Sequence, residues 1–120
     1  CAPGTISASL QMLHHPSVFF AGQLCGVEGY MGNIAAGLLA GINAARFLQG
    51  QDLLILPEET VAGSLFHYIA NADAKHFQPM KANFGILPPL ESAARSKRER
   101  AEQYGKRALN KAALFWGKEI

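Results

Sequence analysis

The sequence has few cysteines and no metal-binding spacing. Cys1 and Cys25 are separated by 24 positions and form no CxxC pair. Two cysteines so placed build neither a disulfide framework nor a zinc site, and this composition is typical of a reducing cytosol. The four histidines lack the H-x-x-x-H spacing that sets two ligands on one helix face. We therefore expect no bound metal.

Two other sequence signals are missing. The first half carries glycines at Gly22, Gly26, Gly29 and Gly32, but no GxGxxG dinucleotide fingerprint. A βαβ unit that grips the ADP part of a dinucleotide is therefore not predicted within these residues. No charged start followed by an apolar stretch and a cleavage site is present. Because the chain begins at Cys1, followed by the loop-forming residues Ala-Pro-Gly, we expect it to be part of a longer protein.

Charge is scarce in most of the chain and concentrated at its end. Residues 1–90 carry three basic and five acidic groups, whereas residues 91–120 carry eight basic and four acidic groups. A basic tail can bind a polyanion such as RNA. The tail also has a simpler interpretation as the solvated face of a helix, because Glu91, Glu99 and Glu102 lie among its basic residues. Both interpretations remain open.

The first half predicts a strand followed by a glycine-rich helix. Residues 18–21 are a short apolar run between a proline and a glycine, typical of a parallel strand buried on both faces. Residues 5–12 alternate loosely and predict a second short strand or a hairpin arm. Residues 31–48 have the length and composition of a helix, with Gly50 placed as its C-terminal cap.

Three glycines interrupt this predicted helix: Gly32, Gly37 and Gly41. Each costs a helix about 1 kcal/mol relative to alanine, so close approach of another group is expected in return. Two interpretations remain open. The glycines allow tight packing on a sheet, or they make room for a cofactor at the helix N-terminus, whose unpaired N–H groups suit an electron-rich ligand. A membrane helix is not expected, because Asn33 and Arg46 interrupt the apolar stretch.

The second half predicts two more helices with a loop between them. Residues 57–60 (PEET) are typical of a helix start, so Glu58 and Glu59 are expected in its first turn rather than as a catalytic pair. This helix is expected to end near Asn71. Residues 72–90 contain three prolines and predict an ordered loop.

Residues 91–116 predict an amphipathic helix. Its apolar residues recur three or four positions apart, at Ala101, Tyr104, Ala108, Ala112 and Phe115. Glu91 with Arg95, and Glu102 with Lys106, are oriented as favourable i,i+4 pairs. Phe115 and Trp116 are expected to anchor the helix by packing rather than to stack on bases.

Two segments resemble known flavoproteins. Residues 18–45, VFFAGQLCGVEGYMGNIAAGLLAGINAA, resemble the C-terminal FAD-contacting segment of two related families that modify tRNA. These are the folate- and FAD-dependent tRNA (uracil-5-)-methyltransferases, TrmFO, and the GidA (MnmG) proteins. The turn GVEGY at residues 26–30 and the segment HFQPMKANFGILPPL at residues 76–90 resemble the first family more closely. The resemblance covers nearly the whole chain and is weakest before residue 16.

The resemblance implies an α/β fold. The chain would be the C-terminal part of a Rossmann-like FAD-binding flavoprotein, mostly helical by itself, with one or two short strands. Residues 1–50 would contribute the strand and glycine-rich helix of the FAD-binding domain. Residues 51–90 would form a helix and a proline-rich loop on the substrate side, and residues 91–120 the basic amphipathic helix.

The resemblance also implies which residues meet the cofactor. Gly22 and Gln23 would contact the ribityl or pyrophosphate side of FAD, and the Gln23 carboxamide offers both a donor and an acceptor. Gly29, Tyr30 and Met31 would present backbone groups to the pyrimidine edge of the isoalloxazine.

Asn83 and Phe84 would lie on the side of the folate and the tRNA. The family's nucleophilic cysteine belongs to sequence upstream, so neither Cys1 nor Cys25 takes that role and the catalytic residues stay unknown. Cys25 is expected to be a small packed residue. Lys81 stands where the family has asparagine and places a charge beside the substrate loop.

The activity implied is methylation of C5 of the T-loop uridine in tRNA, in the cytoplasm. FAD would be reduced by NAD(P)H, and methylenetetrahydrofolate would supply the carbon. The partners would be tRNA and the missing N-terminal part of the same enzyme, with no membrane, and this chain alone would be inactive. One alternative is a GidA-like flavoprotein that modifies the wobble uridine. Another is a small basic RNA-binding or interaction module without a cofactor.

Overall fold

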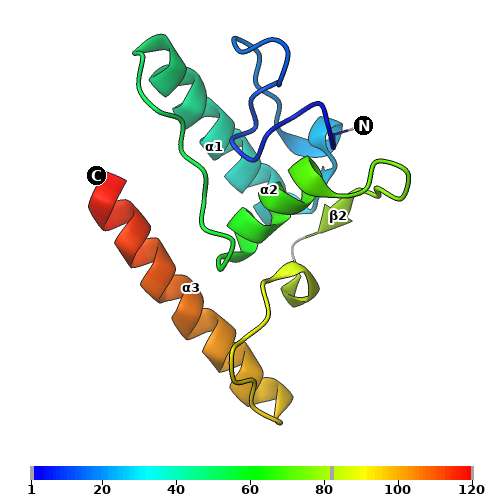
Figure 1. The fold of residues 1–120 in the computed structure, drawn as a ribbon, viewed down its shortest axis with the longest axis vertical. Coiled ribbons are helices and arrows are strands. Elements are labelled where there is room, and N and C mark those ends of the chain that lie inside the picture. Colours follow the sequence, from blue (N-terminus) through cyan, green and yellow to red (C-terminus); the bar gives the residue numbers. More distant parts are fainter. Residues whose placement is uncertain (1, 82, 120) are drawn as a thin grey trace.

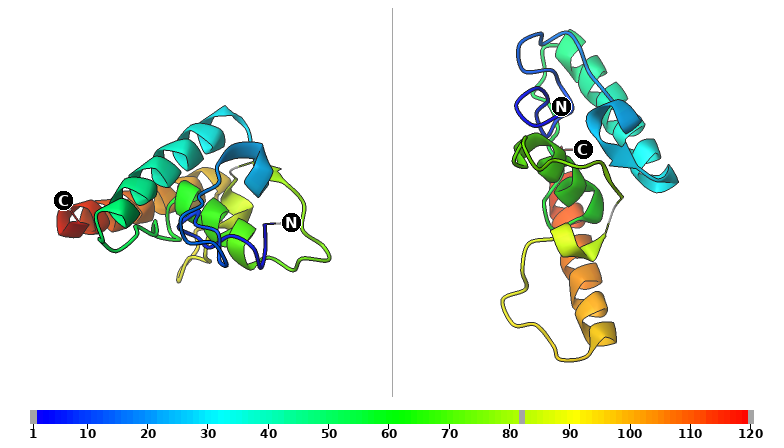
Figure 2. Two further views of the ribbon diagram at one scale, coloured as in Figure 1. Left: turned by 90° about the horizontal axis from the view of Figure 1, so that it is seen from above. Right: turned by 90° about the vertical axis from the view of Figure 1, so that its right-hand side faces the viewer.

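The computed structural model describes residues 2–81 and 83–119. Within this part, three α-helices carry most of the regular structure: α1 (Tyr30–Leu48), α2 (Val61–Asn71) and α3 (Lys97–Glu119). The remaining elements are the strands β1 (Val27–Glu28) and β2 (Met80–Lys81) and the 3-10 helices η1 (Gly22–Cys25) and η2 (Phe84–Ile86). In Figures 1 and 2, α2 lies between α1 and the greater part of α3. The chain is a mixed α/β arrangement dominated by helix.

The glycine-rich helix is confirmed as α1, and it buries one face. Its buried residues recur at helical spacing, at Gly32, Ala36, Leu39, Ala40 and Asn43. Gly50 follows the helix with φ of +70°, the left-handed conformation predicted for the position after its end. The buried face packs in one apolar cluster with α2 and with the N-terminal segment.

Close packing explains only one of the three interior glycines. A Cβ on Gly32 would lie 2.9 Å from Cγ1 of Val27 and 3.3 Å from Cδ2 of Leu65, so α1 approaches its neighbours closely there. At Gly37 and Gly41, a Cβ would meet no described atom within 4 Å. The side of α1 that carries these two glycines is open.

The parallel strand predicted at residues 18–21 is wrong. Phe19 forms an antiparallel bridge with Gln11. The Met12 N–H donates to the Val18 carbonyl at 2.8 Å, and the Phe20 N–H donates to the Leu10 carbonyl at 3.0 Å. A short connection joins antiparallel neighbours, whereas a parallel pair needs a long crossover. Residues 10–12 form the other arm of this hairpin, so the arm predicted for residues 5–12 is confirmed only for their end. Ile6 bridges Met12 in antiparallel fashion, which means that residues 5–12 turn back on themselves.

The start predicted for the second helix is also wrong, because α2 begins at Val61. The Thr60 Oγ1 accepts a hydrogen bond from the Gly63 N–H at 3.0 Å, so Thr60 is the N-cap. The Thr60 N–H donates to the Pro57 carbonyl at 3.1 Å, which closes residues 57–60 into a turn. Glu58 therefore lies before the helix instead of in its first turn, and so does Glu59. The predicted end at Asn71 is confirmed.

The third helix begins at Lys97, later than predicted. The Gln103 side chain accepts from the Ala94 N–H and donates to the Ser92 carbonyl, both at 3.0 Å, so residues 91–96 fold back beside the helix. Serine favours such turns because its side chain competes for local backbone groups. Residues 91 and 95 therefore make no i,i+4 helical pair.

The amphipathic pattern of α3 is confirmed. The five apolar positions predicted for its inner face are all partly buried. Phe115 packs against the core cluster, and its ring meets that of Trp116 edge to face at 5.1 Å. Charged residues project from the rest of the helix, where Arg98 pairs with Glu102 at 3.8 Å. No helix in the described ranges combines the length and apolarity needed to cross a membrane.

Candidate functional site

A short parallel strand pair joins the two segments that carry the family resemblance. β1 lies in the GVEGY turn and β2 in the HFQPMKAN segment, with Val27 opposite Met80. The Met80 N–H donates to the Gly26 carbonyl at 2.9 Å. Because parallel strands end at the same edge, Gly29 and Asn83, which follow the two strands, are brought to one edge. The residues predicted on the cofactor side and on the substrate side therefore follow two paired strands.

Side-chain packing tightens the same junction. Gly26 has φ of +90°, and a Cβ there would overlap the ring of Phe77 from the second segment. Gly29 has φ of +87°, and a Cβ there would lie 3.6 Å from Cγ of Lys81. Glycine is favoured at both positions by backbone conformation. It is required at Gly26 for space as well.

The N-terminus of α1 at this edge is open. Its N-cap is Gly29, which has no side chain to accept a hydrogen bond, and the first bond within the helix runs from the Asn33 N–H to the Gly29 carbonyl at 3.1 Å. The amides of Tyr30, Met31 and Gly32 precede that bond in the first turn. The side chains of Tyr30 and Met31 are 91% and 77% exposed, so they project away from the core.

Asn33 adds a polar group that sequence reasoning missed. Its Oδ1 atom is buried and has no hydrogen-bond partner among the described residues. A Cβ on Gly22 would lie 3.3 Å from this oxygen, and Gly22 has φ of +79°. Gln23, next in η1, is exposed. A polar residue in the first turn, followed by nine small or apolar residues, was the signal that could have identified Asn33.

Asn83 organises the loop on the substrate side. Its Nδ2 donates to the Lys81 carbonyl at 3.0 Å, and its Oδ1 accepts from the Gly85 N–H at 2.8 Å. The carboxamide is thus used within its own turn, which holds η2 beside β2. The side chain of Phe84, the other residue predicted here, lies outside the described part of the structure.

Cys25 is confirmed as a packed residue. It is fully buried, and its Sγ donates to the Gly22 carbonyl at 3.1 Å. Burial raises the pKa of the Cys25 thiol, because the thiolate would lose its hydration. A neutral, enclosed thiol is a poor nucleophile. Cys1 lies outside the described residues.

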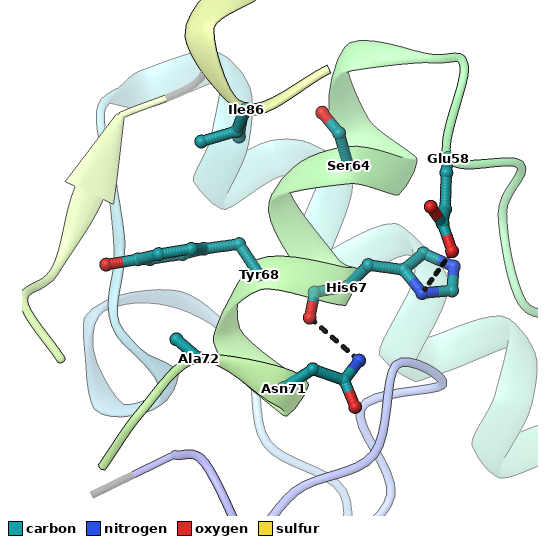
Figure 3. Close-up of a pocket in the computed structure, with 7 residues that line it drawn as sticks. All are labelled: Glu58, Ser64, His67, Tyr68, Asn71, Ala72 and Ile86. Atoms are coloured by element: carbon teal, nitrogen blue, oxygen red, sulfur yellow. Dashed lines mark hydrogen bonds and ion pairs between the residues drawn. The ribbon is translucent and has the colours of Figure 1, made fainter. Parts of the chain in front are cut away.

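A separate cavity of about 440 Å³ lies beside α2 (Figure 3). Its lining is Glu58, Ser64, His67, Tyr68, Asn71, Ala72 and Ile86. Nδ1 of His67 lies 3.4 Å from Oε1 of Glu58. Sequence reasoning missed this pair because it placed Glu58 inside a helix. Among the described residues, no group of three or more His, Cys, Asp or Glu side chains is arranged to hold a metal ion.

Comparison with known proteins identifies the segment. The family model described as "Glucose inhibited division protein A" (GIDA) matches residues 1–52. A protein from Exiguobacterium sp. named methylenetetrahydrofolate--tRNA-(uracil-5-)-methyltransferase TrmFO is 52% identical over 90% of the chain and 25% of the relative. The proteins of the same name from Ligilactobacillus salivarius and Listeria monocytogenes are 47% and 50% identical over 96% and 91% of the chain.

These relatives are much longer than the chain. It spans 26% of the Ligilactobacillus protein and 25% of the Listeria protein. The matches nevertheless extend far beyond residue 52 and take in both segments joined by β1 and β2. Over nine-tenths of its length or more, the chain is therefore homologous to one quarter of the TrmFO methyltransferases, and it belongs with this GidA-related family.

Proposed function

We propose that the chain forms one wall of the FAD and substrate site of a folate-dependent tRNA (uracil-5-)-methyltransferase, as part of a protein about four times its length. The pairing of β1 with β2 is the observation that carries this proposal. It pairs the strand that leads into α1 with the strand that leads into the loop of Asn83, which supports a site with the cofactor at the first and the substrate at the second. The names of the relatives supply the reaction class.

The residues at the turn fit a flavin. The open amides and partial positive charge at the α1 N-terminus suit the electron-rich pyrimidine edge of a reduced isoalloxazine. The unpaired Oδ1 of Asn33 needs a donor, and a ribityl hydroxyl or the flavin imide N–H is such a group. Gly22 keeps the approach to that oxygen free of a side chain, and Gln23 is exposed for contact with the ribityl chain. Bound FAD would supply electron transfer from NAD(P)H.

The loop of residues 83–86 is then the substrate side. Asn83 positions it through hydrogen bonds to Lys81 and Gly85, and Phe84 lies in the same turn. We assign methylenetetrahydrofolate and the T-loop uridine of tRNA to this side, and the complete enzyme to the cytoplasm, where tRNA is modified. The nucleophile comes from the remaining part of the protein, because Cys25 is enclosed. The whole site would belong to a Rossmann-like FAD domain.

The GidA-like alternative is less well supported. The GIDA match covers residues 1–52, the half that the two families share, whereas the TrmFO relatives continue through the segment around β2. A small RNA-binding module without a cofactor would leave the buried, unpaired Asn33 oxygen without a role.

The proposal is tested in a chimera in which this chain replaces the matching segment of the Listeria monocytogenes relative. We expect the purified chimera to retain FAD and to methylate a tRNA transcript when supplied with NADPH and methylenetetrahydrofolate. Asn33→Leu should weaken FAD binding about tenfold, because it removes one hydrogen bond of roughly 1.4 kcal/mol. Asn110→Leu makes the same change on the exposed side of α3 and should have no effect. A folded chimera that lacks flavin would overturn the proposal.

A further inference from the structure

A second hollow adjoins the substrate loop, between η2 and the start of α3. It has a volume of about 260 Å³ and is lined by Gly85, Lys97, Arg100, Ala101 and Tyr104. Two cationic side chains and one aromatic ring thus face a cavity that has no carboxylate among its described lining residues. This combination suits a nucleotide, because cations bind the phosphate and a ring offers a face to a base or sugar. We call this hollow the α3 groove.

The charges of α3 are sorted around the helix. Successive residues are rotated by about 100°, so five basic residues of the sequence fall within a sector of about 80°. They are Lys97, Arg100, Arg107, Lys111 and Lys118. Glu99 and Glu102 project from the far half of the helix, where Glu102 pairs with Arg98. Glu99 and Glu102 therefore offset the basic residues on the far side of α3 and leave the groove side positive. A helix that was only a solvated surface would not need its charges sorted in this way.

Arg107 fixes the groove rather than offering a free charge. Its Nη1 donates to the Pro89 carbonyl at 3.0 Å and its Nη2 to the Pro88 carbonyl at 2.6 Å. Its guanidinium carbon also lies 5.3 Å from the centre of the Tyr104 ring. These contacts tie the segment after η2 to α3, so the two walls of the groove are held together before a ligand arrives.

The groove is continuous with the candidate site. Gly85 lines the groove, and its N–H is held by Oδ1 of Asn83 at the edge where β1 and β2 end. A polyanion bound with one nucleotide at that edge would run past Lys97 and Arg100.

We infer that the α3 groove binds the phosphate backbone of the tRNA, with Lys97 and Arg100 as the phosphate contacts. This inference rests on the function proposed above and adds the surface through which the substrate is held. An acidic segment elsewhere in the enzyme is the competing occupant. If such an acidic segment filled the groove, Lys97 and Arg100 would contribute to the stability of the enzyme instead of to its affinity for tRNA.

The test measures tRNA binding by the chimera as a function of salt. The double variant Lys97→Ala/Arg100→Ala should weaken binding about tenfold and lower the slope of log K against log salt by about 1.5 to 2, as expected for two lost phosphate contacts. Its FAD content and its kcat at saturating tRNA should not change. The double variant Arg98→Ala/Lys106→Ala removes the same charge from the far side of α3 and should alter binding less than twofold.

Two results would overturn the inference. The first is an equal loss of tRNA affinity in both double variants, which would indicate a general charge effect. The second is unchanged tRNA binding in the groove variant, and a lowered melting temperature of that variant would then indicate an internal acidic occupant. The proposed function and the tRNA-binding groove can be contradicted independently of each other. A chimera that lacks flavin and methylation but keeps the difference between the variants supports the groove alone, whereas an active chimera without that difference supports the function alone.

Discussion

Asn43 ties together three parts of the chain from inside α1. It is fully buried, and its Nδ2 donates to the carbonyls of Ser9 and Leu54 at 2.8 and 2.9 Å. Its Oδ1 accepts from the Leu54 N–H at 2.7 Å. One carboxamide thus satisfies three backbone groups that the core shields from water. A polar residue on the buried face of α1 is therefore structural, in contrast to Asn33 at the open end of the helix.

Asn43→Leu should destabilise the chain by about 3 kcal/mol or more, because it leaves two carbonyls and one N–H buried without partners. Urea unfolding of the purified chain measures this change. Asn110→Leu on the exposed side of α3 is the matched control and should stay within about 0.5 kcal/mol of the parent. A loss below about 1 kcal/mol for Asn43→Leu would mean that water or a rearranged backbone satisfies these groups.

Substitution of glycine by alanine at two helical positions should have opposite effects on the stability of the chain. A Cβ on Gly63 would overlap the carbonyl oxygen of Pro57, so Gly63→Ala must displace the turn that caps α2 and should cost about 2 kcal/mol. At Gly37 the space is open, and Gly37→Ala should stabilise the chain by up to about 1 kcal/mol through helix propensity. Thermal unfolding of both variants measures whether each substitution lowers or raises the stability. Destabilisation by both would show that something covers the outer side of α1 in the isolated chain.

The Cys25 thiol should make stability fall at alkaline pH. Its pKa is raised above the ordinary value of 9.0, so the folded chain keeps a proton that the unfolded chain loses. The contribution is complete below pH 9 and is lost as the pH rises through the folded-state pKa. Unfolding free energies measured between pH 7 and 10 should therefore decline more steeply for the parent than for Cys25→Ala. Parallel pH profiles for the two proteins would contradict the prediction.

At the scale of elements, sequence patterns predicted those features of the helices that depend on residues close together in the chain. The composition of α1 and the glycine after it predicted the helix and its end, because propensity and left-handed capping act within a few residues. The starts of α2 and α3 were predicted four and six residues early. In both cases a side chain bonds the backbone that precedes the helix: Thr60 Oγ1 donates to the Pro57 carbonyl, and Gln103 Oε1 accepts from the Ala94 N–H. Several polar residues of the sequence could have taken these roles.

Pairing between distant segments was beyond local reasoning. The apolar run at residues 18–21 predicted a buried strand, but an apolar run does not specify the direction of its partner. The two strands that do pair in parallel are only two residues long each, too short to leave a periodic pattern. Resemblance identified both segments, and the β1–β2 contact then placed them side by side, as the proposed site requires. Asn33 and the α3 groove depended on burial and on neighbours, which the sequence does not display.

At the scale of the whole molecule, one side of α1 resembles an interface. Ile34 and Leu38 are each 64% exposed, and the open positions Gly37 and Gly41 each follow one of them by three residues on the same helix. Exposed apolar clusters of this kind mark binding surfaces. Since the chain spans about a quarter of its relatives, the remaining three quarters of such a protein is the natural cover for this surface.

The isolated chain should not retain FAD. Cofactor sites bury most of the ligand surface, whereas here the turn of Gln23, Tyr30 and Met31 is exposed on one open side. The sequence also lacks the GxGxxG fingerprint that would hold the ADP part. After mixing with FAD and gel filtration, the chain should elute without flavin absorbance, whereas the chimera should elute yellow. Stoichiometric flavin in the chain fraction would show that this wall alone is a complete site, because an open surface would lose the cofactor during the run.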